Sequence, residues 1–281
     1  MPRQLSCDDL VHSGLLNGVG DSLAQFSVGF VKLVERSGME DMVFAGSGTL
    51  VKTQTRFGIL TADHVLQNLP RDEIGLVFPN RNGGSPHRYL LRIDEAQKMR
   101  IGPASNDAEG PDIGVLLLHR SDAAKLEVNS AFYNLEKRRE QMLATPRSIE
   151  AGGWFLRGAA DEWTTDGPPV RAFTKVKVFC GFCAAGVVSA KRADSKFDYL
   201  SFDIAINDAY EGPSDYRGTS GGGLWQLVFE DNDGEIRIAE QLLSGVAFYQ
   251  IAKDGKPQTI VCHGRRSIYA KVLGMLQANA S

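Results

Sequence analysis

A serine between glycines is the part of this sequence best suited to chemistry. Residues 217–225 read Arg-Gly-Thr-Ser-Gly-Gly-Gly-Leu-Trp, so Ser220 lies in a glycine-rich turn that runs into an apolar segment. Glycine lacks a Cβ, which opens backbone conformations closed to other residues and lets a ligand approach. The serine hydroxyl can then attack a substrate, while the N–H groups of Gly218 and Ser220 can face a developing negative charge. Because a serine alone is a weak nucleophile, this chemistry needs a base and an orienting acid.

Candidates for both partners lie earlier in the chain. Residues 58–65 read Gly-Ile-Leu-Thr-Ala-Asp-His-Val, an apolar strand that leads into His64. Residues 111–118 read Pro-Asp-Ile-Gly-Val-Leu-Leu-Leu, with Asp112 at the start of an apolar strand. The predicted catalytic residues therefore occur in the order histidine, aspartate, serine, ending at Ser220.

Two other aspartates are candidates for the acid. Asp107 lies in polar loop sequence and does not directly precede an apolar strand. Asp63 is adjacent to the histidine and cannot easily turn back onto the same imidazole, so we expect it to be structural or solvent-facing. Asp112 is the preferred candidate.

The three segments resemble those of the chymotrypsin-like (trypsin-fold) serine proteases. Thr-Ala-Asp-His-Val is similar to that family's Thr-Ala-Ala-His-Cys, Asp-Ile-Gly-Val-Leu-Leu to its Asp-Ile-Ala-Leu-Leu, and Gly-Thr-Ser-Gly-Gly to its Gly-Asp-Ser-Gly-Gly. The resemblance implies that Ser220 attacks the peptide carbonyl, that His64 carries the proton and that Asp112 orients the histidine. It also implies that Gly218 and Ser220 provide the oxyanion hole, and it spans roughly residues 25–275.

The same resemblance indicates how a protein or peptide substrate would bind. Residues 243–247, Leu-Ser-Gly-Val-Ala, resemble the family's substrate-pairing strand. We therefore expect the backbone of Ser244, Gly245 and Val246 to pair with an extended peptide by strand addition.

Positions just before the nucleophile bear on activation and specificity. Thr219 stands where digestive members of the family carry an aspartate that pairs with a newly cut N-terminus, so we expect no N-terminal processing. The base of the first subsite is expected within residues 211–216. There Asp215 or Glu211 either selects a basic side chain or is only a surface acid.

Charge and motifs argue against several other classes of protein. The 281 residues carry a formal charge of -3 without a long block of one sign, so nucleic acid is not an expected partner. The chain has no run of about 18 apolar residues, so we expect no membrane span. The first residues have no apolar signal-peptide core. We expect no metal or other cofactor, since the H-E-x-x-H and G-x-x-x-x-G-K-[ST] motifs are missing.

The cysteines favour a cytoplasmic protein with reduced thiols. A secreted protease of this fold would often carry a disulfide beside its histidine, where this chain has Val65. Cys180 and Cys183 form a C-x-x-C pair, which we interpret as two cysteines of a β-strand because no second ligand pair exists; Cys7 and Cys262 are the others. The activity of a cytoplasmic protease must be limited so that it does not damage its host, and a regulatory protein partner is one way to limit it.

Short apolar segments separated by turn residues predict an all-β protein with a C-terminal helix. They form two series of about six, which favours two antiparallel six-stranded β-barrels packed face to face, trypsin-like. The first series is Ser27–Val34, Met42–Lys52, Phe57–Thr61, Ile74–Phe78, His87–Ile93 and Ile113–His119. The second is Gly153–Arg157, Val170–Phe179, Gly186–Ala190, Tyr199–Ile206, Gly223–Phe229 and Gln241–Tyr249, with Thr259–His263 as an additional strand.

Helical patterns connect and end these series. Ser121–Leu143 is charged and helix-like, and Ser267–Ala278 has helical periodicity. The expected organisation is an N-terminal extension (1–24), a first barrel (25–120), a partly helical connector (121–150), a second barrel (151–265) and a final helix (266–281). The active site is then expected in the cleft between the barrels.

Two other functions remain open. Residues 218–222 also fit the G-x-S-x-G nucleophile elbow of lipases and esterases, with Asp254 and His263 following in the required order. Little chain remains after Ser220 for the later βα units of that fold. The other alternative is a catalytically silent binding module with a protease fold.

Overall fold

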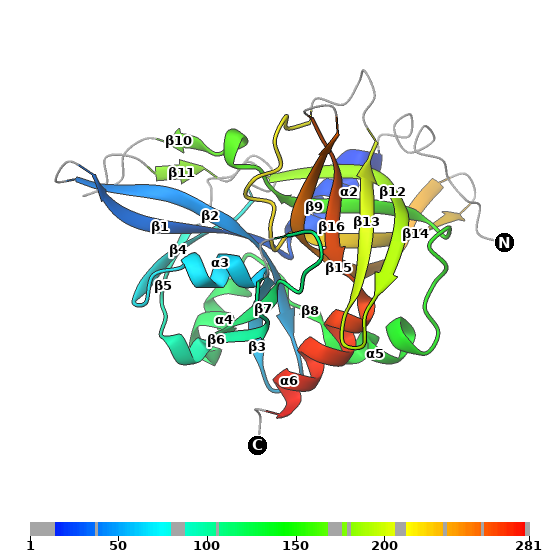
Figure 1. Ribbon diagram of the computed structural model, residues 1–281, viewed down its shortest axis with the longest axis horizontal. Coiled ribbons are helices and arrows are strands. Elements are labelled where there is room, and N and C mark those ends of the chain that lie inside the picture. Colours follow the sequence, from blue (N-terminus) through cyan, green and yellow to red (C-terminus); the bar gives the residue numbers. More distant parts are fainter. Residues whose placement is uncertain are drawn as a thin grey trace.

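Two curled antiparallel sheets make up the described part of the chain (Figure 1). The computed structural model describes residues 15–36, 39–79, 88–104, 107–167, 176–178, 181–205, 212–232, 235–253 and 256–278. The architecture is mostly β with a short C-terminal helix, as the sequence predicts for a trypsin-like fold. The prediction of fold class is therefore confirmed.

The first sheet carries the histidine and aspartate segments. Its strand order is β5-β4-β1-β2-β3-β7-β6, and β8 pairs with β2. The bounds are β1 Ser27–Arg36, β2 Met39–Lys52, β3 Phe57–Thr61, β4 Glu73–Val77, β5 Arg88–Arg92, β6 Lys98–Gly102, β7 Ile113–Leu118 and β8 Tyr133–Asn134. Strand β6 is not predicted from the sequence, because its short Lys-Met-Arg-Ile-Gly segment is only partly buried.

The second sheet closes into a barrel in the order β12-β13-β16-β15-β14-β9. A closed barrel leaves no unpaired edge to aggregate. Its strands are β9 Gly153–Ala159, β12 Gly181–Ala193, β13 Asp198–Ile204, β14 Gly223–Asn232, β15 Glu235–Lys253 and β16 Lys256–His263. A separate pair, β10 (Thr165–Gly167) and β11 (Val176–Val178), covers part of the expected Val170–Phe179 strand, most of which lies outside the described residues.

Short helices flank the sheets. The expected helical connector consists of two helices separated by β8, and the final helix begins as a π-helical turn. The helices are α2 Leu15–Ala24, α3 Asp63–Asn68, α4 Arg120–Leu126, α5 Leu135–Leu143, η3 Ser267–Val272 and α6 Leu273–Ala278, with 3₁₀ turns η1 Glu95–Gln97 and η2 Asp161–Trp163. Within the described ranges, none is long and apolar enough to cross a bilayer.

An aromatic cluster joins the two halves. Trp225 of β14 is fully buried, stacks on Phe26 with ring centroids 5.2 Å apart, and meets the edge of Tyr133 of β8 at 5.2 Å. The Tyr133 hydroxyl donates to the carbonyl of Gln241 on β15. Such buried aromatic pairs contribute packing beyond the area they bury. The cluster therefore fixes the barrel against the first sheet, next to the loop that carries Ser220.

Candidate active site

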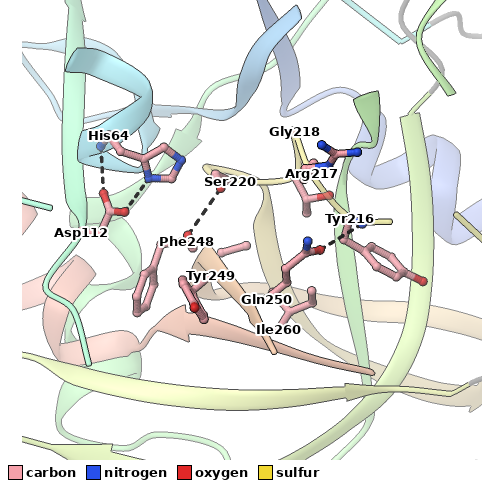
Figure 2. Close-up of a pocket in the computed structure, with 12 residues that line it drawn as sticks. His64, Asp112, Tyr216, Arg217, Gly218, Ser220, Phe248, Tyr249, Gln250 and Ile260 are labelled. Carbon is pink, nitrogen blue, oxygen red and sulfur yellow. Dashed lines mark hydrogen bonds and ion pairs between the residues drawn. The ribbon is translucent and has the colours of Figure 1, made fainter. Parts of the chain in front are cut away.

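The three predicted catalytic residues line one cavity of about 440 Å³. His64 and Asp112 come from the first half of the chain and Ser220 from the second, so the cavity lies where the two sheets meet (Figure 2). The remaining lining residues come from the loop before Ser220 and from β15 and β16: Tyr216, Arg217, Gly218, Thr219, Ala247, Phe248, Tyr249, Gln250 and Ile260.

His64 and Asp112 are joined by two hydrogen bonds. Strand β3 leads into α3, and the backbone N–H of His64 donates to Oδ1 of Asp112 at 2.9 Å. The Nδ1 atom of His64 lies 2.5 Å from Oδ2 of the same carboxylate, which is buried. Since an ionised carboxylate only accepts, Nδ1 carries the proton and Nε2 is left able to receive one. Figure 2 shows the Nε2 side of the ring turned toward Ser220.

Asp63 has a structural role next to the histidine. Its fully buried carboxylate binds Nε and Nη2 of Arg100, both at 2.8 Å, and accepts from Gln67 and from the N–H of Ala104. Burial raises the pKa of Asp63, but the hydrogen bonds from Arg100, Ala104 and Gln67 outweigh burial and lower it. The ionised side chain therefore anchors the start of α3 to Arg100 and Ala104.

Asp107, the other candidate acid, is exposed. Its Oδ1 accepts the N–H of Glu109 at 2.9 Å within a surface turn. It is not among the residues that line the cavity.

The loop around Ser220 is fixed through its carbonyl groups. Each of the four consecutive carbonyls of residues 217–220 accepts a hydrogen bond. The donors are the N–H of Asp161 to Arg217 (2.8 Å), Oγ–H of Ser47 to Gly218 (2.8 Å), the N–H of Gly222 to Thr219 (2.7 Å) and the N–H of Ser47 to Ser220 (2.9 Å).

These bonds determine where the N–H groups point. In a trans peptide the N–H lies opposite the preceding carbonyl. The bonds at the carbonyls of Arg217 and Thr219 therefore turn the N–H groups of Gly218 and Ser220 away from Asp161 and Gly222. In the described part of the chain, neither N–H donates to a protein acceptor. Both residues line the cavity, where these two donors can bind one anionic oxygen.

Two tight turns present the serine. The N–H of Thr219 bonds to the carbonyl of Tyr216, with Gly218 at φ +89° in the third position. The N–H of Gly222 bonds to the carbonyl of Thr219, with Gly221 at φ +90°. A positive φ at the third position is the requirement of a type II turn and favours glycine. Ser220 thus occupies the second position of the second turn.

The serine hydroxyl lies at the limit of hydrogen-bonding range from the carbonyl of Phe248, at 3.5 Å. No hydrogen bond joins this oxygen to His64 among the described residues, although both side chains line the cavity (Figure 2). Catalytic hydrogen bonds are commonly long without substrate and shorten when it binds.

The expected substrate-pairing residues do not line the cavity. Ser244 is fully buried, and its hydroxyl bonds to the carbonyl of Leu242. Gly245 and Val246 pair with β14, and Val246 is fully buried. None of these three residues is among those that line the cavity.

The part of β15 that faces the cavity lies a few residues further along. Phe248, Tyr249 and Gln250 line the cavity, beyond the point where β14 begins opposite Val246. The pairing of β15 with β16 shifts register between Ala247 and Tyr249, as a β-bulge would produce.

Both oxygens of the Asp215 carboxylate already have partners. Its Oδ1 accepts from Nε2 of Gln250 and from the N–H of Arg217, both at 2.9 Å, and Oδ2 pairs with the Arg217 guanidinium. Partial burial raises the pKa of Asp215, but the bonds from Gln250 and Arg217 outweigh it and lower the pKa. The carboxylate is ionised but occupied, so it cannot freely pair with a basic substrate side chain. Glu211 lies outside the described residues.

The remaining candidate groups do not form a second centre. Burial raises the pKa of the Cys183 thiol to about 11 and that of Cys262 well above its usual range, so neither is a ready nucleophile. Cys7 and Cys180 lie outside the described residues. The described ranges hold no group of three or more metal-ligating side chains.

His263, the base required by the esterase alternative, is engaged elsewhere. It is fully buried, and its Nε2 accepts the N–H of Asp112 at 2.9 Å. Asp254 lies outside the described residues. The geometry gives His263 no access to the Ser220 hydroxyl.

Comparison with known proteins supplies little beyond this geometry. No protein-family model and no curated protein sequence matches the chain. Among solved structures, the HtrA-type protease AlgW with decapeptide aligns at 15% sequence identity and a TM-score of 0.44. The alignment covers 91% of this chain and 66% of that one, slightly under two thirds of its length. Function must therefore be argued from the site.

The turn at Gly221 provides a test of the loop geometry. A Cβ there would lie 2.0 Å from the Ser47 carbonyl oxygen and 2.1 Å from Oγ1 of Thr61. We expect Gly221→Ala to lower the free energy of unfolding by more than about 1 kcal/mol in urea denaturation. Gly18→Ala is the control, because no heavy atom lies within 4 Å of its added Cβ. It should be stabilising by up to about 1 kcal/mol; equal effects of the two substitutions would contradict the geometry.

Proposed function

We propose that this protein is a serine endopeptidase that cleaves protein or peptide substrates through an acyl-enzyme. The observation that carries the proposal is that the hydrogen-bonded pair of His64 and Asp112 lines the same cavity as Ser220. Two N–H groups that face this cavity supply the anion site. A nucleophile, a base, an orienting acid and paired donors are the parts that acyl transfer needs.

The reaction follows from these positions. Oγ of Ser220 attacks the substrate carbonyl carbon while Nε2 of His64 takes its proton, and the carboxylate of Asp112 stabilises the resulting imidazolium. The carbonyl oxygen becomes an anion held by the N–H groups of Gly218 and Ser220. The C–N bond then breaks, and His64 returns the proton to the leaving amine. Water repeats the sequence on the acyl-enzyme and releases the acid.

The loop of residues 217–220 is expected to assemble without cleavage of the chain. Thr219 is buried, and its hydroxyl lies 3.5 Å from the carbonyl of Ala159. The four carbonyl bonds of residues 217–220 hold the loop from Ser47, Asp161 and Gly222. None of these donors belongs to a chain terminus, so no newly formed N-terminus is required.

An extended substrate would pair with β15 at Phe248, Tyr249 and Gln250. These residues line the cavity, and the pairing of β15 with β14 stops at Val246, before this segment. Strand addition at such a segment supplies main-chain hydrogen bonds that are independent of substrate sequence.

The chemical identity of the nucleophile can be tested by substitution. Ser220→Ala should lower peptide turnover by about 10⁶, and adding His64→Ala should cost little more, because the two residues act as a unit. A fluorophosphonate probe should label the folded wild-type chain but not Ser220→Ala. Ser189→Ala, at an exposed serine of β12, should leave labelling and turnover unchanged. No label on folded wild-type protein would favour a binding module without turnover.

The occupied carboxylate of Asp215 predicts the preference at the first subsite. In a peptide panel that varies only the residue before the scissile bond, lysine and arginine should be cleaved no faster than uncharged residues. Arg217→Gln should raise the relative rate for the basic peptides by about 2- to 5-fold, the effect of releasing one exposed ion pair. A wild-type preference for basic residues would contradict this account of specificity.

A further inference from the structure

A second histidine lies directly behind the candidate acid. His263 ends β16 and is fully buried. Its ring centroid lies 4.8 Å from that of Phe248, 5.1 Å from that of Tyr199 and 5.6 Å from that of Phe197. The ring is therefore enclosed by aromatic side chains on several sides, which restricts its rotation.

The hydrogen bonds of His263 define its protonation. The backbone N–H of Asp112 is a donor, so Nε2 at 2.9 Å must be the acceptor. The proton of the neutral ring then resides on Nδ1, which lies 3.3 Å from Oγ of Ser267. A second proton on Nε2 would leave two N–H donors, that of the ring and that of Asp112, pointing at each other. Burial also lowers the pKa of His263 to about 3, so the ring is neutral at neutral pH.

This ring touches two segments that the reaction needs. Through Nε2 it holds the backbone of Asp112, whose carboxylate binds both the N–H and the Nδ1 atom of His64. Through its face it packs on Phe248, whose carbonyl lies 3.5 Å from the hydroxyl of Ser220. His263 belongs to the barrel, whereas Asp112 belongs to the first sheet, so the bond crosses between the two halves.

We propose that His263 is a positioning residue that fixes the Asp112 carboxylate relative to the His64 ring. Without an acceptor at Nε2, the buried N–H of Asp112 loses its hydrogen-bond partner. Because an unpaired buried N–H is unfavourable, we expect the backbone of Asp112 to move. A shift of about 1 Å at a catalytic group can cost about 10²-fold in rate. The catalytic consequence rests on the proposed function, whereas the geometry of the His64–Asp112 bond can be measured without any turnover.

The test compares three variants of the full chain. His263→Phe keeps an aromatic ring but removes the acceptor, His263→Gln retains an acceptor oxygen at similar reach, and Tyr199→Phe perturbs the same cluster without touching Asp112. The low-field proton NMR resonance of the His64 Nδ1–H···Asp112 bond is the first measurement. We expect it to shift or disappear in His263→Phe and to remain in the other two variants.

Kinetics provide the second measurement. We expect His263→Phe to lower kcat by about 10²-fold with KM unchanged, and His263→Gln to recover most of the loss. A wild-type resonance and kcat in folded His263→Phe would overturn the proposal. Equal losses in His263→Phe and Tyr199→Phe would also overturn it, because they would indicate packing alone. Failure of the wild-type chain to react with a fluorophosphonate would instead reject the proposed function. The NMR measurement alone would then test the positioning role of His263.

If His263→Phe does not fold, the wild-type protein still decides the matter. Nitrogen-15 NMR should find the His263 ring protonated at Nδ1 and unprotonated at Nε2 at neutral pH. A ring protonated at Nε2 could not accept from Asp112 and would overturn the proposal.

Discussion

The constraint on which the site depends is that the carbonyl groups around Ser220 are held from outside the cavity. Ser47 of β2 binds two of them, through its hydroxyl to Gly218 and its N–H to Ser220, while the N–H of Asp161 binds that of Arg217. Because peptide planes are rigid, holding these oxygens also sets the direction of the intervening N–H groups. The first sheet thus shapes a loop that belongs to the barrel half, and this loop carries the two N–H groups of the proposed anion site.

A matching dependence runs in the other direction. The backbone of Asp112, on the first sheet, is bound by His263 at the end of β16, and Asp112 in turn binds His64. Each half of the molecule therefore binds the backbone of a proposed catalytic residue carried by the other half. The aromatic contacts of Trp225 with Phe26 and Tyr133 lie in the shared core and hold the halves in this relation. A site built across such an interface is precise only while both halves stay packed.

The sequence predicts the fold class and places His64, Asp112 and Ser220 in their local settings because short apolar strands and glycine turns are local signals. It does not predict β6, a short and partly charged strand, or α2, which lies within the expected N-terminal extension. The resemblance of residues 243–247 to a substrate-pairing strand predicts Ser244, Gly245 and Val246 for this role, whereas the residues of β15 that line the cavity are Ala247, Phe248, Tyr249 and Gln250. The partners of Asp215 and His263 depend on contacts between distant segments, for which a single sequence carries no local pattern.

The central claim, a nucleophile beside an anion site assembled in advance, is tested most directly by a crystal structure of the protein inactivated with a peptidyl phosphonate. The account predicts phosphorus bonded to Oγ of Ser220 and one phosphonyl oxygen about 2.7–3.1 Å from the backbone nitrogens of Gly218 and Ser220. The carbonyl of Arg217 should still accept from Asp161, as it does in the free protein. A folded protein that leaves Ser220 unmodified, or an adduct in which the Arg217 carbonyl has turned into the cavity, would contradict the account.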